Sequence, residues 1–353
     1  MDARMGLVTA VVMGMVVTAV AGCATEPTGA VSGPMVVVLN QAPKPALHLI
    51  DLESGQEARR IALRSPAIDL DAGGGRVVTA QCGGVGTDAD DVIGVYDAAR
   101  RGRIRYFDSV APNPVDITLL STSTAVVSNG WMDEKGIVVS LVDVRRRHIV
   151  AEGRVPDMTD KPALVGGVLW AHSIRADGTR RQLRRIDPGT LRSVVVTEGP
   201  DAPVAVVGDE NDPHRMFALD AWDRSARPLR VRLHPFDGSA ASLIGGGRLY
   251  EFEDGPGRSA MIGNVLAIAD FTDIDPQNHG TRVLLTRPGV SNQVRHASVP
   301  GGPAAICVWR GRFLVLESRT GRILAIDPET GAVTRVGGVP GKDRMLVDMA
   351  VID

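Results

Sequence analysis

The stretch RILAIDPETGAVTRV at residues 322–336 decides the fold of this chain. An apolar segment at 322–326 ends in Asp327, a Pro-Glu-Thr-Gly turn follows, and a second alternating segment begins at Ala332. The turn has a local cause, because proline presets φ, aspartate caps the turn, and glycine takes the positive φ. The segment therefore predicts two antiparallel β-strands joined by a tight turn.

The same pattern recurs along the chain, with Arg287 replacing the aspartate in one copy. The seven marker positions are separated by 46, 46, 44, 50, 50 and 40 residues, and they are residues 51, 97, 143, 187, 237, 287 and 327. A mean spacing of 46 residues matches a four-stranded propeller blade and exceeds most helical repeats. The chain is therefore predicted to be all-β, a seven-bladed β-propeller. Tandem hairpins in a sandwich remain the alternative.

The two ends of the repeat region predict how the ring closes. Residues 35–39 (MVVVL) align with the second strand of a blade, and residues 345–351 (MLVDMAV) align with the first. We therefore expect the N- and C-terminal strands to pair within one blade, which leaves no open edge between the ends of the ring. The propeller domain is predicted to span 35–353.

The repeat resembles the YVTN and quinoprotein-like β-propeller superfamily over nearly all of the chain after residue 34. The match is best at 321–341, where IDPETG leads to VGGVPG. The resemblance implies the fold. It implies no particular activity, because propellers host enzymes, receptors and scaffolds alike.

The first 23 residues have the pattern of an export signal. Arg4 precedes an uncharged run over 5–21, which small residues close. Residues 20–23 (VAGC) resemble the lipobox of bacterial lipoproteins. The resemblance implies cleavage after residue 22, a diacylglyceryl group on the Cys23 sulfur, and a lipid anchor on the extracytoplasmic face of the cell membrane. An ordinary signal peptide with a chance cysteine and an uncleaved anchor are the alternatives. Residues 23–34 are then a flexible tether.

Composition excludes several classes of protein. Lys and Arg total 39 against 41 Asp and Glu, which gives a net charge of −2 with 44% hydrophobic residues. This balance excludes a disordered chain and a polybasic nucleic-acid-binding protein. The arginine runs at 145–147 and 180–181 lie in or near predicted turns, so we interpret them as a solvated rim.

Acidic residues gather in two of the loops that follow second strands. Asp88 and Asp90 lie in the loop at 81–90, and Asp273 and Asp275 lie in the loop at 271–280. Carboxylate oxygens at such spacing suit Ca²⁺, although neither loop has the spacing of an EF-hand. Solvated turns are the simpler interpretation of both clusters.

Other loop residues predict a ligand platform. Trp131 and Trp222 fall in loops on the same predicted face, where their rings could stack on a ligand, and His279 adds an imidazole to the second acidic loop. Burial of each tryptophan against its own loop is the alternative.

The sequence contains none of the catalytic motifs sought. No His-x-x-x-His pair, Gly-x-Ser-x-Gly elbow or phosphate-binding loop occurs in a suitable setting. Cys82 and Cys307 fall two blades apart, so we expect two separate thiols. No catalytic residue and no cofactor is predicted. We expect a non-catalytic binding or protein-interaction scaffold, whose partner is an envelope protein or a small ligand. A propeller enzyme of lactonase or lyase type is the alternative.

Overall fold

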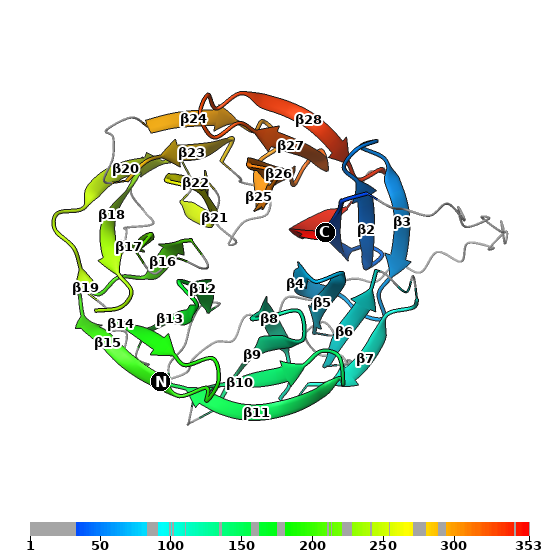
Figure 1. Cartoon of the computed structure of the whole chain (residues 1–353), viewed down its shortest axis with the longest axis horizontal. Coiled ribbons are helices and arrows are strands. Elements are labelled where there is room, and N and C mark those ends of the chain that lie inside the picture. Colours follow the sequence, from blue (N-terminus) through cyan, green and yellow to red (C-terminus); the bar gives the residue numbers. More distant parts are fainter. Residues whose placement is uncertain are drawn as a thin grey trace, which may run out of the picture. The chain divides into compact units, whose positions relative to one another are not determined.

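The repeat folds into seven antiparallel β-sheets that stand around a central axis as the blades of a propeller (Figure 1). Residues 31–353 form a compact unit of their own. The computed structural model describes, apart from the side chains at 131–133 and 174, the following residues: 33–82, 91–98, 100, 102–109, 111–133, 136–156, 162–174, 181–209, 212, 214–220, 228–240, 242–253, 255–270, 280–288, 294–341 and 344–352. Within these residues, no helix has the length and apolarity needed to cross a membrane.

Each blade begins with an inner strand and ends with an outer one. Blade 1 has β29 (Met345–Ile352), β1 (Met35–Ala42), β2 (Ala46–Asp51) and β3 (Glu57–Ala62). Blade 2 has β4 (Ala67–Gly73), β5 (Arg76–Gln81), β6 (Val92–Asp97) and β7 (Arg105–Asp108). Blade 3 has β8 (Pro114–Leu119), β9 (Thr124–Asp133), β10 (Gly136–Asp143) and β11 (His148–Val155). Blade 4 has β12 (Ala163–Val165), β13 (Val168–Ile174), β14 (Arg181–Ile186) and β15 (Ser193–Gly199).

The remaining three blades follow the same order, with one exception in blade 5. Blade 5 has β16 (Ala205–Gly208), β17 (Met216–Leu219), β18 (Leu229–Asp237), β19 (Ser242–Leu243) and β20 (Arg248–Phe252). Blade 6 has β21 (Pro256–Ile262), β22 (Val265–Asp270), β23 (Arg282–Thr286) and β24 (Val294–Ser298). Blade 7 has β25 (Pro303–Trp309), β26 (Arg312–Glu317), β27 (Arg322–Ile326) and β28 (Val333–Gly338).

The exception in blade 5 is its outer position, which two short strands share. β19 pairs with one end of β18 and β20 pairs with the other. Residues 244–247 (IGGG) separate them, and Gly247 lies against the His234 ring, where a Cβ would come within 2.5 Å of Nδ1. A glycine is therefore required where the outer strand is interrupted.

The predicted closure of the ring is confirmed. β29 pairs with β1 in an antiparallel register from Met35 opposite Ile352 to Ala42 opposite Met345 (Figure 1). The C-terminal strand thereby becomes the inner strand of the blade that the N-terminal residues began. Neither β1 nor β29 leaves an edge open between the ends of the ring.

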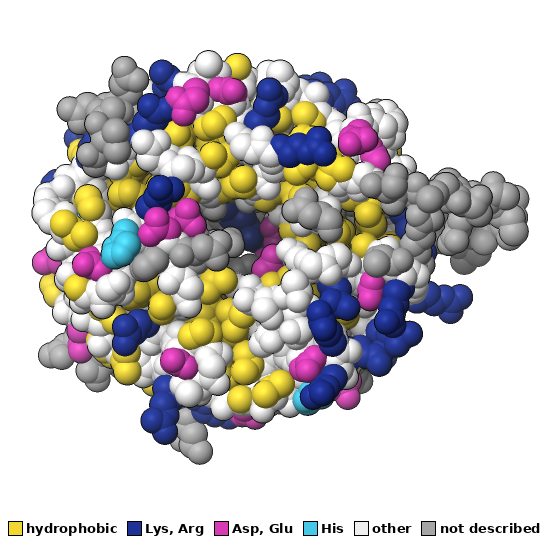
Figure 2. All heavy atoms as spheres, in the orientation of Figure 1, with side chains coloured by type: hydrophobic (Ala, Val, Ile, Leu, Met, Phe, Trp, Pro, Cys, Tyr) yellow, Lys and Arg dark blue, Asp and Glu magenta, His cyan; other side chains and the backbone are white. Residues whose placement is uncertain are grey.

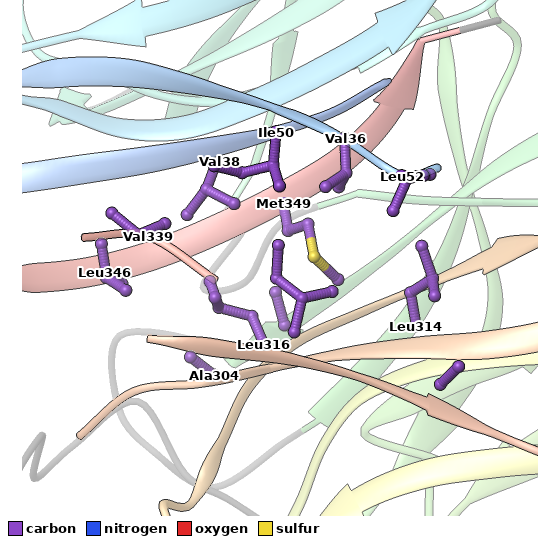
Figure 3. Close-up of a cluster of buried hydrophobic side chains, with 13 residues drawn as sticks. Val36, Val38, Ile50, Leu52, Ala304, Leu314, Leu316, Val339, Leu346 and Met349 are labelled. Atoms are coloured by element: carbon purple, nitrogen blue, oxygen red, sulfur yellow. The ribbon is translucent and has the colours of Figure 1, made fainter. Parts of the chain in front are cut away.

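The core consists of apolar clusters between adjacent blades. Between blades 1 and 7, Val36, Ile50 and Met349 face Leu314 and Leu316 (Figure 3). Alternate residues of each strand face opposite neighbours, so the inner and middle strands are apolar on both faces and contain the long Val, Ile and Leu runs of the sequence. Each blade is therefore stabilised by its neighbours, and the ring depends on closure.

The marker aspartates cap the turns between third and fourth strands, as predicted. Asp327 Oδ1 accepts the N–H groups of Glu329 and Thr330 at 3.0 and 2.8 Å and the Thr330 hydroxyl at 2.8 Å. The same bonds to turn N–H groups recur at Asp51, Asp97, Asp143, Asp187 and Asp237. Arg287, at the one exceptional marker, instead pairs with Glu329 of the next blade.

We name the side of the ring that carries these turns the aspartate-turn face. The opposite side, where second strands end and blades connect, is the loop face.

These caps predict a pH dependence that substitution can test. Hydrogen bonds from turn N–H groups lower the pKa of Asp327 below its ordinary value of 3.8, and four other markers, Asp51, Asp143, Asp187 and Asp237, behave alike. A carboxylate whose folded pKa is depressed stabilises the fold above the ordinary value, and that contribution is lost as pH falls through the folded pKa. Asp327→Ala should therefore lower the melting temperature by a few degrees at pH 7, and the deficit should shrink at acid pH. Asp327→Asn, which keeps an acceptor oxygen, is the control. A deficit independent of pH would contradict this role for the charge.

Candidate functional site

Every second strand has a polar residue at or near its loop-face end. Aligning the seven strands places these residues at one position, and they are Asn40, Gln81, Asn129, Ser173, Asp220, Asp270 and Glu317. Six of them are at most 3% exposed, and Asp220 is half-buried. Buried polar groups at the end of an apolar strand require hydrogen-bond partners.

The blade-to-blade connections supply many of those partners. Glu317 Oε1 accepts the Gly301 N–H at 3.0 Å, and Asp270 accepts the N–H groups of Glu253 and Gly255 at 2.7 and 3.1 Å. The Asn129 amide donates to the Ala111 and Pro112 carbonyls. Gln81 accepts from Ser65, and Asn40 accepts the Met345 N–H at 3.1 Å. This ring of polar residues therefore fixes the connections that shape the loop face.

Besides Ser173, which accepts a hydrogen bond from Arg184 Nε at 3.0 Å, two acidic residues of this set contact a basic side chain. Arg282 Nε lies 2.9 Å from Asp270 Oδ2, and His234 Nε2 lies 2.9 Å from Asp220 Oδ2. Both partners come from the adjacent third strand of the same blade, β23 and β18. The two contacts therefore hold second and third strands together at the point where the longest loops leave them.

A second set of charges crosses the central channel. Arg258, from the β21 bulge in blade 6, lies 3.1 Å from Asp69 of blade 2 and 3.3 Å from Asp348 of blade 1. The two aspartates are 1% and 2% exposed, whereas the Arg258 side chain keeps 31% of its surface. Figure 2 shows charged side chains at the edge of the central opening. One guanidinium therefore pairs with two buried carboxylates and links three blades.

The same carboxylates also join adjacent inner strands. Asp348 Oδ2 accepts the Leu70 N–H at 3.2 Å, and Asp69 Oδ2 accepts the Ile117 N–H at 2.9 Å. Asp71 repeats the contact one step further along β4, with the Leu119 N–H at 2.7 Å. Inner strands have no neighbour on the channel side, so these side chains satisfy backbone donors that would otherwise be unpaired.

We name the contacts of Arg258 with Asp69 and Asp348, together with the bonds from these aspartates to the Ile117 and Leu70 N–H groups, the channel lock. The sequence analysis missed it, although a signal for it was present. Asp348, Asp69 and Asp116 occupy matching positions of the inner strands in three consecutive blades, one register step below the polar strand ends. Aligning the repeat on first strands would have revealed the three aspartates. No local pattern links them to Arg258, which is 189 residues from Asp69.

The predicted site residues fall mainly outside the described residues. These are Asp88, Asp90, Trp222, Asp273, Asp275, His279 and the lipidation candidate Cys23, while Trp131 lies in β9 with its side chain outside the description. The strands before and after the loops that contain these residues are described, and they meet those loops at the loop face. Across the rest of the described chain, no group of three His, Cys, Asp or Glu side chains could hold a metal ion.

The two described cysteines are free thiols, as predicted. Burial raises the pKa of both Cys82 and Cys307 above the ordinary thiol value. Both therefore remain protonated at neutral pH, and neither has the lowered pKa that a thiolate nucleophile requires. Trp170 is buried, with its ring edge-on to Phe236.

Comparison with known proteins supports the fold. No family model and no curated protein matches the chain. A "putative 6-phosphogluconolactonase" from Bacteroides fragilis superposes with a TM-score of 0.58 at 12% identity, covering 93% of this chain and 100% of that one. Another from Bacteroides uniformis gives 0.57 at 11%, covering 91% and 100%. A functionally unknown protein from Desulfotomaculum acetoxidans gives 0.56 at 10%, covering 89% and 99%. Identities this low show a shared propeller architecture alone.

Proposed function

We propose that this protein is a lipid-anchored, extracytoplasmic propeller that acts as a non-catalytic binding or protein-interaction scaffold at the cell envelope. The observation that carries the proposal is the channel lock. Asp69 and Asp348 each bind Arg258 and a backbone N–H, so their charges serve to join blades. A catalytic acid or base needs a free lone pair or proton facing a substrate.

The loop-face carboxylates support the same proposal. Glu317 accepts the Gly301 N–H and the Thr320 hydroxyl, and Asp270 accepts two N–H groups beside Arg282. Such side chains shape a rigid platform on which loops can be presented to a partner. Cys23, through the lipobox that it completes, supplies the attachment to the membrane.

A capture experiment on intact cells tests the scaffold. Cells expressing the tagged chain are cross-linked, and the protein is purified from detergent-solubilised membranes, with Cys23→Ala as the unanchored control. We expect one enriched envelope protein, and we expect Trp222→Ala in a loop-face loop to reduce its recovery at least about tenfold, as a hot-spot tryptophan would. Trp309→Ala, at the end of β25 on the aspartate-turn face, is the matched control and should leave recovery unchanged. Equal loss in both variants, with both folded, would contradict binding at the loop face.

A lactonase or lyase of propeller type is the second candidate. The structural likeness to two proteins, each described as a "putative 6-phosphogluconolactonase", favours it, together with the acidic loops at Asp88, Asp90, Asp273 and Asp275. On the scaffold account, the purified chain leaves hydrolysis of 6-phosphogluconolactone at its spontaneous rate, and millimolar Ca²⁺ leaves the melting temperature unchanged. Turnover that Asp273→Ala with Asp275→Ala abolishes would establish the enzyme instead.

A further inference from the structure

The chain enters the propeller on the aspartate-turn face. The Leu52 N–H donates to the Pro34 carbonyl at 3.1 Å, and Gly33 lies beside the Asp51 and Glu53 side chains. Asp51 is the marker aspartate of blade 1, so β1 starts at this face and runs toward the loop face. The segment between Cys23 and Gly33 reaches about 35 Å when fully extended. An anchor at Cys23 therefore keeps the aspartate-turn face within that distance of the bilayer.

Arginines gather on this same face in blades 2 and 3. The third-to-fourth-strand turns of these two blades carry Arg100, Arg103, Arg105, Arg145, Arg146 and Arg147, which we name the arginine patch. The Arg100 and Arg146 side chains are 79% and 80% exposed. Figure 2 shows basic side chains gathered over the sector where Figure 1 places β6, β7 and the turn from β10 to β11.

The positive charge of the patch is largely uncompensated within its turns. Only Asp97 and Asp143 in these turns are acidic, and each also caps its turn by accepting backbone N–H groups. Asp97 is shared between Arg76 of β5 at 3.6 Å and Arg100 at 3.7 Å, and Asp143 lies 4.0 Å from Arg146. The Arg100 and Arg146 side chains are solvent-exposed, so these two contacts are weak.

The matching turns of blades 1, 5 and 7 have the opposite balance. Residues 51–57 of blade 1 contain three acidic residues, and residues 327–333 of blade 7 contain two, with no basic residue in either turn. The turn at 237–242 of blade 5 has one aspartate and no basic residue. The turn at 187–193 of blade 4 has one aspartate and one arginine, and the turn at 287–293 of blade 6 has Arg287 as its one charged residue. The large arginine excess therefore belongs to one sector, in the two blades that follow the tether's entry in blade 1.

We propose that the arginine patch binds the phosphate groups of anionic phospholipids, so that this sector of the aspartate-turn face rests on the membrane and the loop face points away from it. Guanidinium groups bind phosphate bidentately, and several arginines near an anionic surface each strengthen binding by about fivefold. A patch of this kind beside a lipid anchor gives two attachment signals. The orientation of the ring rests on the proposed anchoring at Cys23, whereas binding of lipid by the patch does not.

Vesicle flotation tests the patch without the anchor. The probe is residues 31–353, which form a compact unit, with vesicles of phosphatidylglycerol and phosphatidylcholine or of phosphatidylcholine alone. We expect flotation only with the anionic vesicles and its loss in high salt, because screening weakens exposed charges. Arg145→Glu with Arg146→Glu should reduce the bound fraction at least about tenfold.

A matched variant separates the patch from net charge. Arg64→Glu with Arg319→Glu changes the charge by the same amount on exposed positions of the loop face, and it should float as the parent does. Equal loss in both variants, or equal flotation with both kinds of vesicle, would overturn the proposal. The mass of the mature N-terminal peptide in cells tests lipidation of Cys23 separately, so failure of the anchor and failure of the patch give different results.

Discussion

Deletion of residues 342–353 should leave residues 31–341 without a cooperative unfolding transition. The deletion removes β29, which supplies the inner strand of blade 1 and packs beside β4 and β25. Leu346, Met349 and Ile352 are buried, and each contributes about 1.5–3 kcal/mol by burial. Asp348, its bond to Leu70 and its pairing with Arg258 are lost as well. Together, these lost contributions are of the same order as the free energy of unfolding of a typical domain, which is about 5–15 kcal/mol.

Circular dichroism during heating measures this effect. The control removes residues 23–30 instead, by starting the chain at residue 31, and its melting temperature should equal that of the mature protein because these residues lie outside the compact unit. A truncated protein that stays monomeric and melts at the parental temperature would show that the ring does not need the closing strand.

Replacement of Arg258 by Met should cost about 3 kcal/mol of the free energy of unfolding. The substitution takes the guanidinium away from the buried Asp69 and Asp348 carboxylates, and breaking a buried ion pair on one side is expensive. This value is the lower end of the roughly 3–5 kcal/mol that breaking a buried ion pair costs. We choose the lower end because the Arg258 side chain is 31% exposed, so water can partly solvate the carboxylates in its place. Denaturant titration of Arg258→Met against the parent gives the value.

Two further variants separate charge from packing. Arg258→Met combined with Asp69→Asn and Asp348→Asn keeps acceptor oxygens for Leu70 and Ile117 but removes both buried negative charges, so it should be more stable than Arg258→Met alone. Arg230→Met breaks an exposed pair with Glu251, whose side chains are 63% and 55% exposed, and should change stability by less than about 0.5 kcal/mol. Equal effects of Arg258→Met and Arg230→Met would contradict the channel lock.

The features that the sequence predicted are those with local causes. The Asp-Pro-x-Thr-Gly turn fixes its own hydrogen bonds, so the marker at Asp327 located the third-to-fourth-strand turns of the ring. The period of 46 residues then fixed the number of blades, and the alignment of 345–351 with first strands predicted the closure.

Features that depend on distant partners were not predicted. Asp348 and Leu70 are 278 residues apart, and only the closed ring brings them together. The interrupted outer strand of blade 5 was missed as well, because the glycine run at 245–247 also fits an ordinary connection between strands. Trp222, Asp273 and Asp275 lie outside the described residues, and their roles remain predictions.

Photo-cross-linking from the loop face tests the central claim most directly. A photoreactive amino acid is placed at position 222 in a loop-face loop, and at position 194 on the exposed outer strand β15 as the comparison. In intact cells the scaffold account predicts one adduct with an envelope protein from position 222, none from 194, and loss of the adduct when Cys23→Ala releases the chain. Adducts of equal yield from both positions, or no adduct together with lactone turnover by the purified chain, would contradict it.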